Sequence, residues 1–234
     1  VKTMVLTRDA TSAEVASWMK QIRPHLEEGG QCALLVRDGV LDYPKRKYAN
    51  AYPLRREDAI ARILDAAGDA VIVATTGKTG RELFELREQR GEDHAHEFLT
   101  VGSMGHAGAI ALGIALHRPQ QRVIILDGDG AALMHMGALA TIGAAAPPNL
   151  IHILLNNEAH ESVGGAPTAA STVHFPAVAE NLGYHVLPTA QTADELTHTL
   201  AQLHDTHALA FLEVRTAIGS RADLGRPTTT PHEN

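Results

Sequence analysis

Short apolar runs alternate along most of the chain with segments whose apolar residues recur at helical spacing. The apolar runs are the length of buried strands and cover residues 70–74, 123–126, 150–155, 185–187 and 210–214. The helical segment over residues 55–67, which precedes the first of these runs, places Ala59, Ile60 and Ile63 on one face. Strands that alternate with helices in this way predict an α/β domain with a mostly parallel sheet flanked by helices.

The pattern between the main runs predicts the remaining elements. We expect helices over residues 81–90, 132–145, 175–182 and 193–203, and a further helix that begins at residue 107. A strand is expected over residues 99–101 and a loop over residues 158–172. Pro147 and Pro148 end the helix over 132–145, since proline cannot continue a helix. The small residues after 107 would let that helix lie close to the sheet.

The ends of the chain differ from this domain. Residues 11–28 predict an amphipathic helix that Gly29 and Gly30 end, and residues 33–36 predict a short strand. Residues 38–53 are typical of a linker. We therefore divide the chain into a helix-strand segment with its linker (1–50), a main domain (51–219) and a flexible tail (220–234).

Composition and charge exclude several classes of protein. Hydrophobic residues make up 44% and charged residues 20%, and the net charge of −7 argues against nucleic acid or an anionic membrane as the main partner. No apolar run reaches the length of a membrane span, and the N-terminus lacks a signal core. With one cysteine, Cys32, we expect no internal disulfide and a buried structural thiol in a cytoplasmic protein.

The candidate chemistry lies where two predicted strands end. Asp129, within Gly128-Asp129-Gly130, follows one strand, and Asn157 follows the next strand after an intervening helix. The carboxyl ends of parallel strands meet at one edge, where ligands bind in such folds. Mg²⁺ prefers an octahedral shell of oxygens with one or two carboxylates, and phosphate oxygens or water as the rest. A dinucleotide loop is the alternative, but Leu133 stands where its third glycine belongs.

Four motifs extend this pattern and carry a resemblance. They are Thr75-Thr-Gly-Lys-Thr-Gly-Arg-Glu-Leu-Phe84, Leu99-Thr-Val-Gly-Ser-Met-Gly-His106, Gly128-Asp-Gly-Ala-Ala-Leu-Met134 and Leu155-Asn-Asn-Glu-Ala-His-Glu-Ser-Val-Gly-Gly165. Over roughly residues 45–215 the chain resembles the phosphonopyruvate decarboxylases, with the sulfopyruvate decarboxylases as near relatives. The resemblance implies a thiamine-diphosphate-binding fold and decarboxylation of 3-phosphonopyruvate to phosphonoacetaldehyde and CO₂.

The resemblance also implies residue roles. Asp129 and Asn157 would bind Mg²⁺ through their side chains, and Ala159 through its backbone oxygen. Lys78 and His106 are the catalytic candidates, against the ordinary alternatives of a solvated lysine and a histidine that starts a helix. The residues expected to bind thiamine diphosphate are Thr75, Thr76, Gly77, Gly102, Ser103, Met104, Gly128, Asp129, Gly130, Ala131, Asn157, His160, Glu161 and Ser162.

One functional group of such enzymes has no place in this sequence. The glutamate that activates the cofactor's pyrimidine belongs to a separate pyrimidine-binding domain in the enzymes that this chain resembles. We therefore expect an α-subunit to supply that domain in an α2β2 or higher hetero-oligomer, with residues 1–50 completing its sheet and a small anionic 2-oxoacid as substrate. The alternatives are a fragment of a longer enzyme, a sulfopyruvate decarboxylase β-subunit and a non-catalytic cofactor-holding or regulatory subunit.

Overall fold

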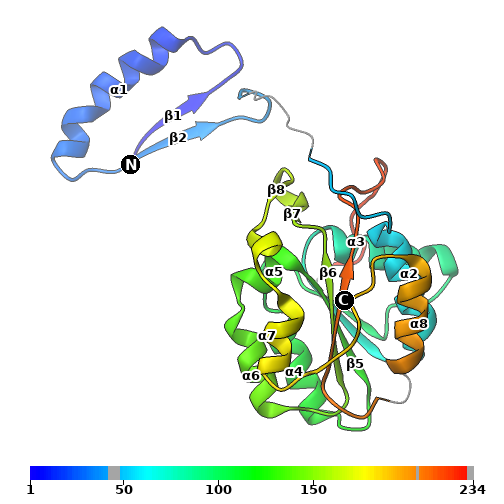
Figure 1. Cartoon of the computed structure of the whole chain (residues 1–234). Helices are drawn as coiled ribbons and strands as arrows, with labels where there is room; N and C mark the ends of the chain where they lie inside the picture. Colours follow the sequence, from blue (N-terminus) through cyan, green and yellow to red (C-terminus); the bar gives the residue numbers. More distant parts are fainter. Residues whose placement is uncertain (42–47, 204–205, 231–234) are drawn as a thin grey trace. The chain divides into compact units, whose positions relative to one another are not determined.

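The chain forms two compact units, Val1–Arg46 and Lys47–Asn234. The structure is a computed structural model that describes residues 1–41, 48–203 and 206–230 (Figure 1). Each unit has its own secondary structure and is described by itself. Across the described residues, none of the helices combines the length and apolarity needed to cross a membrane.

The first unit is one strand-helix-strand motif. It consists of β1 (Lys2–Leu6), α1 (Ser12–Glu27) and β2 (Cys32–Val36), and the two strands pair in parallel. Thr11 and Glu14 start α1 with a reciprocal capping box, as a Thr-x-x-Glu sequence favours. The helix and β2 confirm the sequence prediction. The sequence analysis missed β1 because one five-residue run shows too little alternation, and Cys32 is half-buried rather than buried.

The second unit is a three-layer α/β domain. Its strands lie in the order β4-β3-β5-β6-β10-β9, and all of their described pairings are parallel. The strands are β3 (Val71–Ala74), β4 (Glu97–Leu99), β5 (Val123–Gly128), β6 (Leu150–Asn156), β9 (His185–Val186) and β10 (Ala210–Arg215). The helices are α2 (Arg56–Ala67), α3 (Lys78–Arg90), α4 (Ala107–His117), α5 (Asp129–Met134), α6 (Gly137–Ala145), α7 (Phe175–Asn181) and α8 (Ala193–Leu203). The predicted fold class is confirmed.

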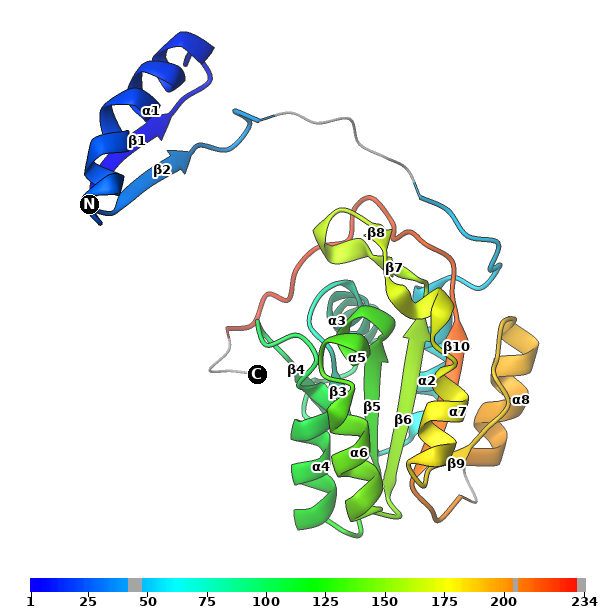
Figure 2. The same cartoon turned by 60° about the vertical axis from the view of Figure 1, so that its left-hand side comes forward.

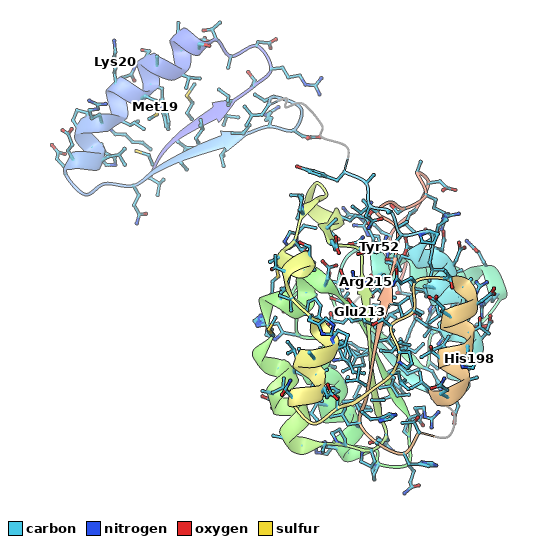
Figure 3. All side chains as sticks on the ribbon, viewed as in Figure 1. Met19, Lys20, Tyr52, His198, Glu213 and Arg215 are labelled. Atoms are coloured by element: carbon cyan, nitrogen blue, oxygen red, sulfur yellow. The ribbon has the colours of Figure 1, made fainter. Side chains whose placement is uncertain are left out.

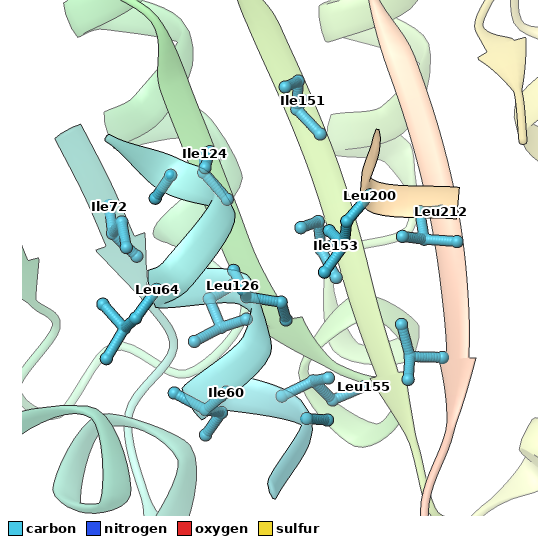
Figure 4. Close-up of a cluster of buried hydrophobic side chains, with 14 of the residues drawn as sticks. Ile60, Leu64, Ile72, Ile124, Leu126, Ile151, Ile153, Leu155, Leu200 and Leu212 are labelled. Atoms are coloured by element: carbon cyan, nitrogen blue, oxygen red, sulfur yellow. The ribbon is translucent and has the colours of Figure 1, made fainter. Parts of the chain in front are cut away.

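Helices cover both faces of this sheet. Figure 2 shows α4, α6 and α7 in front of the strands, with α2, α3 and α8 on the other face. Each face has its own apolar cluster. Figure 4 shows the first, in which Ile60 and Leu64 of α2 and Leu200 of α8 meet Leu126 of β5 and Ile153 of β6. Strands covered on both faces read as nearly continuous apolar runs, which is why the sequence predicted them.

The connections reverse direction between β3 and β5. From β3 the chain runs through α3 to the edge strand β4 and then returns through α4 to β5, on the other side of β3. Ala74 at the end of β3 lies opposite Leu126 of β5, and Gly128 lies opposite Leu155 of β6. Such a reversal leaves a crevice at the carboxyl ends of the strands. The turn after Ala74 and the Gly128-Asp129-Gly130 turn therefore open at the same place.

Three predicted boundaries are wrong. α3 begins at Lys78 rather than 81, because Gly77 with its φ of 107° makes the turn one residue before it. β4 covers residues 97–99 rather than 99–101. Glu97 is buried and forms an ion pair with Arg87, while Val101 is 70% exposed. The helix predicted over 132–145 is two helices, α5 and α6. The chain leaves helical geometry at His135, without the proline that would reveal the break.

Two segments expected to lack structure make defined contacts. The loop predicted over 158–172 contains an antiparallel hairpin, β7 (Ala159–His160) with β8 (Ala166–Pro167), and two 3₁₀ turns, η1 (Glu161–Val163) and η2 (Ala169–Thr172). In the predicted tail, the Ser220 hydroxyl bonds Lys78, and Arg221 pairs with Glu57 of α2 and Glu85 of α3. The tail's flexibility stays a prediction, and residues 231–234 lie outside the described residues.

Candidate functional site

A cavity of about 110 Å³ lies at the carboxyl edge of the sheet where the connections reverse. Its walls come from the ends of β3, β5 and β6, from the start of α3 and from the β7–η1 segment. The lining residues that the sequence analysis selected are Thr75, Thr76, Lys78, Met104, Gly128, Asp129, Gly130, Ala131, Asn157, Ala159, His160, Glu161 and Ser162. Four separate stretches of sequence thus meet at one cavity.

Asp129 is the most buried carboxylate on the cavity wall, with 2% of its surface exposed. Its Oδ2 accepts a 2.5 Å hydrogen bond from the Thr168 hydroxyl, and backbone N–H groups, including that of Asn157, also donate to it. Burial raises the pKa of Asp129 above its ordinary value, although these hydrogen bonds lower it. A carboxylate held in place yet costly to leave charged is well suited to a divalent cation.

The two adjacent asparagines point to different places. Asn156 is fully buried and its Nδ2 donates 2.7 Å to Glu213 Oε1 on β10, while Asn157 lines the cavity. Asn157 Oδ1 accepts from the Ala159 N–H at 3.1 Å and keeps a second lone pair. The placement agrees with the choice of Asn157 rather than Asn156. Glu158 lies between Asn157 and the β7–β8 hairpin. Its φ of 61° is a left-handed conformation that makes the turn.

The predicted backbone ligand lies in a suitable position. Ala159 faces Pro167 at a non-hydrogen-bonded position of the β7–β8 hairpin, since the neighbouring Thr168 N–H bonds the Glu158 carbonyl, so Pro167 gives the Ala159 carbonyl no hydrogen bond. Within the part of the chain that the structure describes, no three His, Cys, Asp or Glu side chains converge as a metal site. A cation here would therefore need the mixed oxygen donors of a hard ion: a carboxylate, an amide and a backbone carbonyl.

The turn after β3 supplies an unpartnered polar group. Thr75 is 3% exposed, and its Oγ1 is buried without a hydrogen-bond partner among the residues that the structure describes. A buried hydroxyl without a partner is costly, so a polar ligand at the cavity would stabilise it. Gly77 is needed next to it: a Cβ there would lie 2.4 Å from Ser162 Oγ, and its φ is 107°. These residues fit a phosphorylated cofactor held by backbone and hydroxyl groups.

An ionic network fills one side of the cavity. Arg56 on α2 is 5% exposed and binds Glu82 of α3 through Nε and Nη2 at 2.7 and 2.8 Å. Its Nη1 donates to Glu161, which Lys78 Nζ also approaches at 3.4 Å. Burial alone would raise the pKa of Glu161, but Arg56 and Lys78 lower it below its ordinary value. Glu161 is therefore charged within this cluster.

Four predicted residues do not line the cavity: Gly77, Gly102, Ser103 and His106. Gly102, Ser103 and His106 are exposed, and the His106 ring packs against His135 with 4.1 Å between the ring centroids. Only Met104 of this motif reaches the cavity wall. The proposed cofactor contacts of Gly102 and Ser103, and the catalytic role of His106, stay predictions.

A second network supports the loop after β6. The Tyr52 hydroxyl donates 2.7 Å to Glu158, and Arg215 Nη1 donates 2.6 Å to the same hydroxyl. Arg215 also lies 3.6 Å from Glu213, the partner of Asn156. Figure 3 shows Tyr52, Glu213 and Arg215 grouped together at this end of the sheet. Tyr52 and Arg215 thus hold the side chain of Glu158, the left-handed residue in the turn after β6.

Sequence reasoning missed four residues at or beside the site. Arg56 and Thr168 are single polar residues with no motif around them, Glu82 lies inside the Thr75–Phe84 motif but had no predicted role, and Ser220 lies in the predicted tail. A signal existed only for Arg56 and Glu82: a charged residue predicted to lie on the buried side of an amphipathic helix needs a partner. Nothing in the linear sequence pairs Thr168 with Asp129.

The chain matches one family model and is similar to proteins that are named as decarboxylases. Residues 75–214 match the family model described as the thiamine pyrophosphate enzyme, C-terminal TPP binding domain. A phosphonopyruvate decarboxylase of Streptomyces hygroscopicus is 43% identical over 76% of this chain and 43% of its own length. The sulfopyruvate decarboxylase subunit beta of Methanothermobacter thermautotrophicus is 37% identical over 69% of this chain and 83% of its own length.

A solved structure agrees on the fold. The thiamine diphosphate-dependent 4-hydroxybenzoylformate decarboxylase of Rhodococcus jostii RHA1 superposes with a TM-score of 0.58 at 21% identity, over 75% of this chain and 35% of that chain. The chain spans less than half the length of the phosphonopyruvate decarboxylases that it matches, 43% in one and 47% in another.

Proposed function

We propose, starting from the fact that the chain belongs to the thiamine pyrophosphate enzymes, that it is the diphosphate-binding part of a 2-oxoacid decarboxylase. The substrate would be 3-phosphonopyruvate, cleaved to phosphonoacetaldehyde and CO₂ with thiamine diphosphate and Mg²⁺. The observation that carries the proposal is the placement of Asp129 and Asn157 on one cavity at the reversal point of the sheet. Relatives named phosphonopyruvate decarboxylase at 43% and 40% identity support the choice of substrate.

Each residue on the cavity wall would have a binding or orienting role. Asp129, Asn157 and the Ala159 carbonyl would hold Mg²⁺, with Thr168 fixing the orientation of the Asp129 carboxylate. The turn that Thr75 opens would accept the diphosphate. When bound, thiamine diphosphate supplies the electron sink for the carbanion that departing CO₂ leaves. Met104 would support the shape of the cofactor against the wall.

We propose a partner for the remaining chemistry. Two similar proteins are named as beta subunits of sulfopyruvate decarboxylase, which favours an α-subunit with the pyrimidine-binding domain and the activating glutamate. We propose an α2β2 or higher hetero-oligomer, cytoplasmic and part of phosphonate biosynthesis. The same domain within one longer polypeptide is the alternative.

A second candidate substrate is 3-sulfopyruvate. The M. thermautotrophicus subunit is matched over 83% of its length, a fuller match than the phosphonopyruvate decarboxylases give. The two substrates differ in the anionic group, so recognition of that group decides between them. A third candidate is a cofactor-holding or regulatory subunit without catalytic residues, and a purely regulatory subunit would not need Asp129.

The experiment combines the chain with its pyrimidine-binding partner and measures CO₂ release from both oxoacids. We expect turnover of 3-phosphonopyruvate by the assembled enzyme, none by the chain alone, and near-complete loss with Asp129→Ala. Asp69→Ala, an exposed aspartate away from the cavity, is the matched control and should keep full turnover. Turnover by the chain alone would exclude the need for a partner. Preference for 3-sulfopyruvate would change the substrate, and full activity of Asp129→Ala would favour the regulatory candidate.

A further inference from the structure

Four hydrogen-bond donors converge on the carboxylate of Glu161. Its side chain is 8% exposed. The donors are Arg56 Nη1, Lys78 Nζ at 3.4 Å, Asn157 Nδ2 at 2.7 Å and the Gly219 N–H at 3.1 Å. They come from α2, from the start of α3, from the turn after β6 and from the segment after β10. Such a cluster of donors from distant segments surrounds one anionic group.

The donor group has the chemistry that binds phosphoryl or phosphonyl oxygens. An arginine, a lysine, a side-chain amide and a backbone N–H together give directed and charge-assisted hydrogen bonds. Glu82 fixes Arg56 by a two-point ion pair, which leaves Nη1 directed at the cavity. A fixed guanidinium loses little conformational entropy when it binds an anion. Glu161 therefore occupies a preformed anion site.

The charges in this cluster balance only while Glu161 is present. Arg56 and Lys78 carry two positive charges, and Glu82 and Glu161 carry two negative charges. A second anion brought to the same donors would be repelled by the Glu161 carboxylate, whose charge is poorly screened at this burial. Binding of a phosphoryl group at these donors thus requires Glu161 to leave them.

The segment that holds Glu161 has the means to move. Glu161 begins the three-residue turn η1, directly after the two-residue strand β7. Gly164 and Gly165 follow with φ values of 112° and 79°, and Val163 is 79% exposed. A short segment with few buried apolar contacts and flanking glycines opens at low free-energy cost.

We propose, building on the function proposed above, that Glu161 is an internal competitor which occupies a phosphoryl- or phosphonyl-binding site formed by Arg56, Lys78, Asn157 and Gly219. An incoming phosphoryl or phosphonyl group displaces it. The group has two sources, the diphosphate of the cofactor or the phosphonate of the substrate. Arg56 then binds the anion directly, a role that no sequence motif around it on α2 suggests.

The test measures binding by the full chain with isothermal titration calorimetry, without reference to turnover. Glu161→Gln keeps the shape of the side chain and removes its charge. We expect it to bind one of two probes about tenfold more tightly than the wild type: thiamine diphosphate with Mg²⁺, or methylphosphonate. Tighter binding of the first probe assigns the site to the cofactor's diphosphate, and of the second to the substrate's phosphonate. Unchanged or weaker binding of both probes would overturn the proposal.

Two further variants keep the result specific. Glu180→Gln makes the same charge change at an exposed position on α7, away from the cavity wall, so its affinities should equal those of the wild type. Adding Lys78→Met to Glu161→Gln should remove the gain, because it removes one of the donors. If the gain also appears in Glu180→Gln, or persists in the double variant, the site is not the one proposed.

The two proposals fail in different ways. An absence of decarboxylation by the wild type with its partner would contradict the proposed function. Equal affinities of Glu161→Gln and wild type would contradict the competitor role, even if decarboxylation proceeds normally. Circular dichroism of each variant confirms that the fold is retained, and Arg56 keeps Glu82 as a partner when the charge of Glu161 is removed.

Discussion

At the scale of the residue, the site depends on how one carboxylate is held. Asp129 has no basic side chain among the groups that shift its pKa; the Thr168 hydroxyl and backbone N–H groups orient it instead. Thr168 is 8% exposed and caps the 3₁₀ turn η2 through the Ala170 N–H. The Thr168 hydroxyl thus joins the segment after the β7–β8 hairpin to the proposed metal ligand Asp129.

Replacing that hydroxyl should weaken metal binding without removing a metal ligand. Thr168→Val keeps the shape and removes the donor to Asp129, and we expect Mg²⁺ affinity in the presence of thiamine diphosphate to fall about 10–100-fold. Thr168→Ser should restore most of it. Calorimetric titration of Mg²⁺ measures both. Equal affinity of Thr168→Val and the wild type would show that Thr168 does not position Asp129.

The placement of motif residues on the cavity could be predicted at this scale, and support from distant residues could not. Asp129 and Asn157 were predictable because both follow strands whose parallel pairing brings their ends together. Thr168 and Arg56 were not, because each contact joins positions far apart in sequence through one side chain. His106 shows the opposite case: its motif was found, yet the ring lies against His135 outside the cavity wall.

At the scale of the element, α3 is joined to β4 by a charged cluster beside an aromatic ring. His94 stacks on Phe84 with 4.2 Å between ring centroids and bonds Glu97 at 2.5 Å and Glu88 at 2.8 Å. Burial by itself lowers the pKa of His94, but the two carboxylates together raise it above its ordinary value. Arg87 completes the cluster by binding the buried Glu97.

This cluster should make the stability of the domain depend on pH. Because the folded pKa of His94 is raised, its contribution is complete below the ordinary histidine pKa and is lost as pH rises through the folded value. We expect His94→Gln to lower the free energy of unfolding by about 1 kcal/mol at pH 6. The difference from the wild type should shrink toward pH 9.

Urea unfolding at several pH values measures this difference. Glu88 and Glu97 stay in both proteins, so the comparison isolates the histidine. His117→Gln is the control, since its exposed ring contacts the Gly113 carbonyl of α4 rather than a carboxylate. A difference that grows with pH, or that His117→Gln reproduces, would contradict the prediction.

Element types were predictable and several boundaries were not. The buried strands β5, β6 and β10 follow from continuous apolar runs, which only a sheet covered on both faces accommodates. The break between α5 and α6 lacks such a signal. There Gly105 approaches so closely that a Cβ would lie 2.8 Å from the Ala131 carbonyl oxygen. Tertiary contact, rather than a helix-breaking residue, accompanies that break.

At the scale of the whole molecule, the first unit exposes an apolar strand pair. Val5 and Leu35 lie opposite each other on β1 and β2 and are 45% and 55% exposed. A two-stranded sheet is marginal in water and gains stability from further strands or a packed surface. The expected α-subunit would supply that surface, in keeping with the prediction that residues 1–50 complete its sheet.

A charge on this face should separate assembly from folding. Leu35→Asp places a carboxylate among exposed apolar side chains, and we expect the chain to keep its circular dichroism spectrum while losing binding to the partner. Arg37→Asp, on an exposed residue just after β2, is the matched control and should bind normally. Size-exclusion chromatography of the mixed subunits measures the complex. Normal assembly of Leu35→Asp would place the interface elsewhere.

The all-parallel pairing of the six-stranded sheet also has a consequence for how the domain forms. A parallel pair cannot close through a tight turn, so each contact waits for a crossover to be made. The pairing of Ile151 with Ala210 joins strands separated by the β7–β8 hairpin, two 3₁₀ turns, α7, β9 and α8. Contacts of this kind slow folding and leave apolar edges open meanwhile. On the ribosome, the apolar edge of β6 would stay uncovered until β10 emerges, so we expect newly made chains to need chaperones.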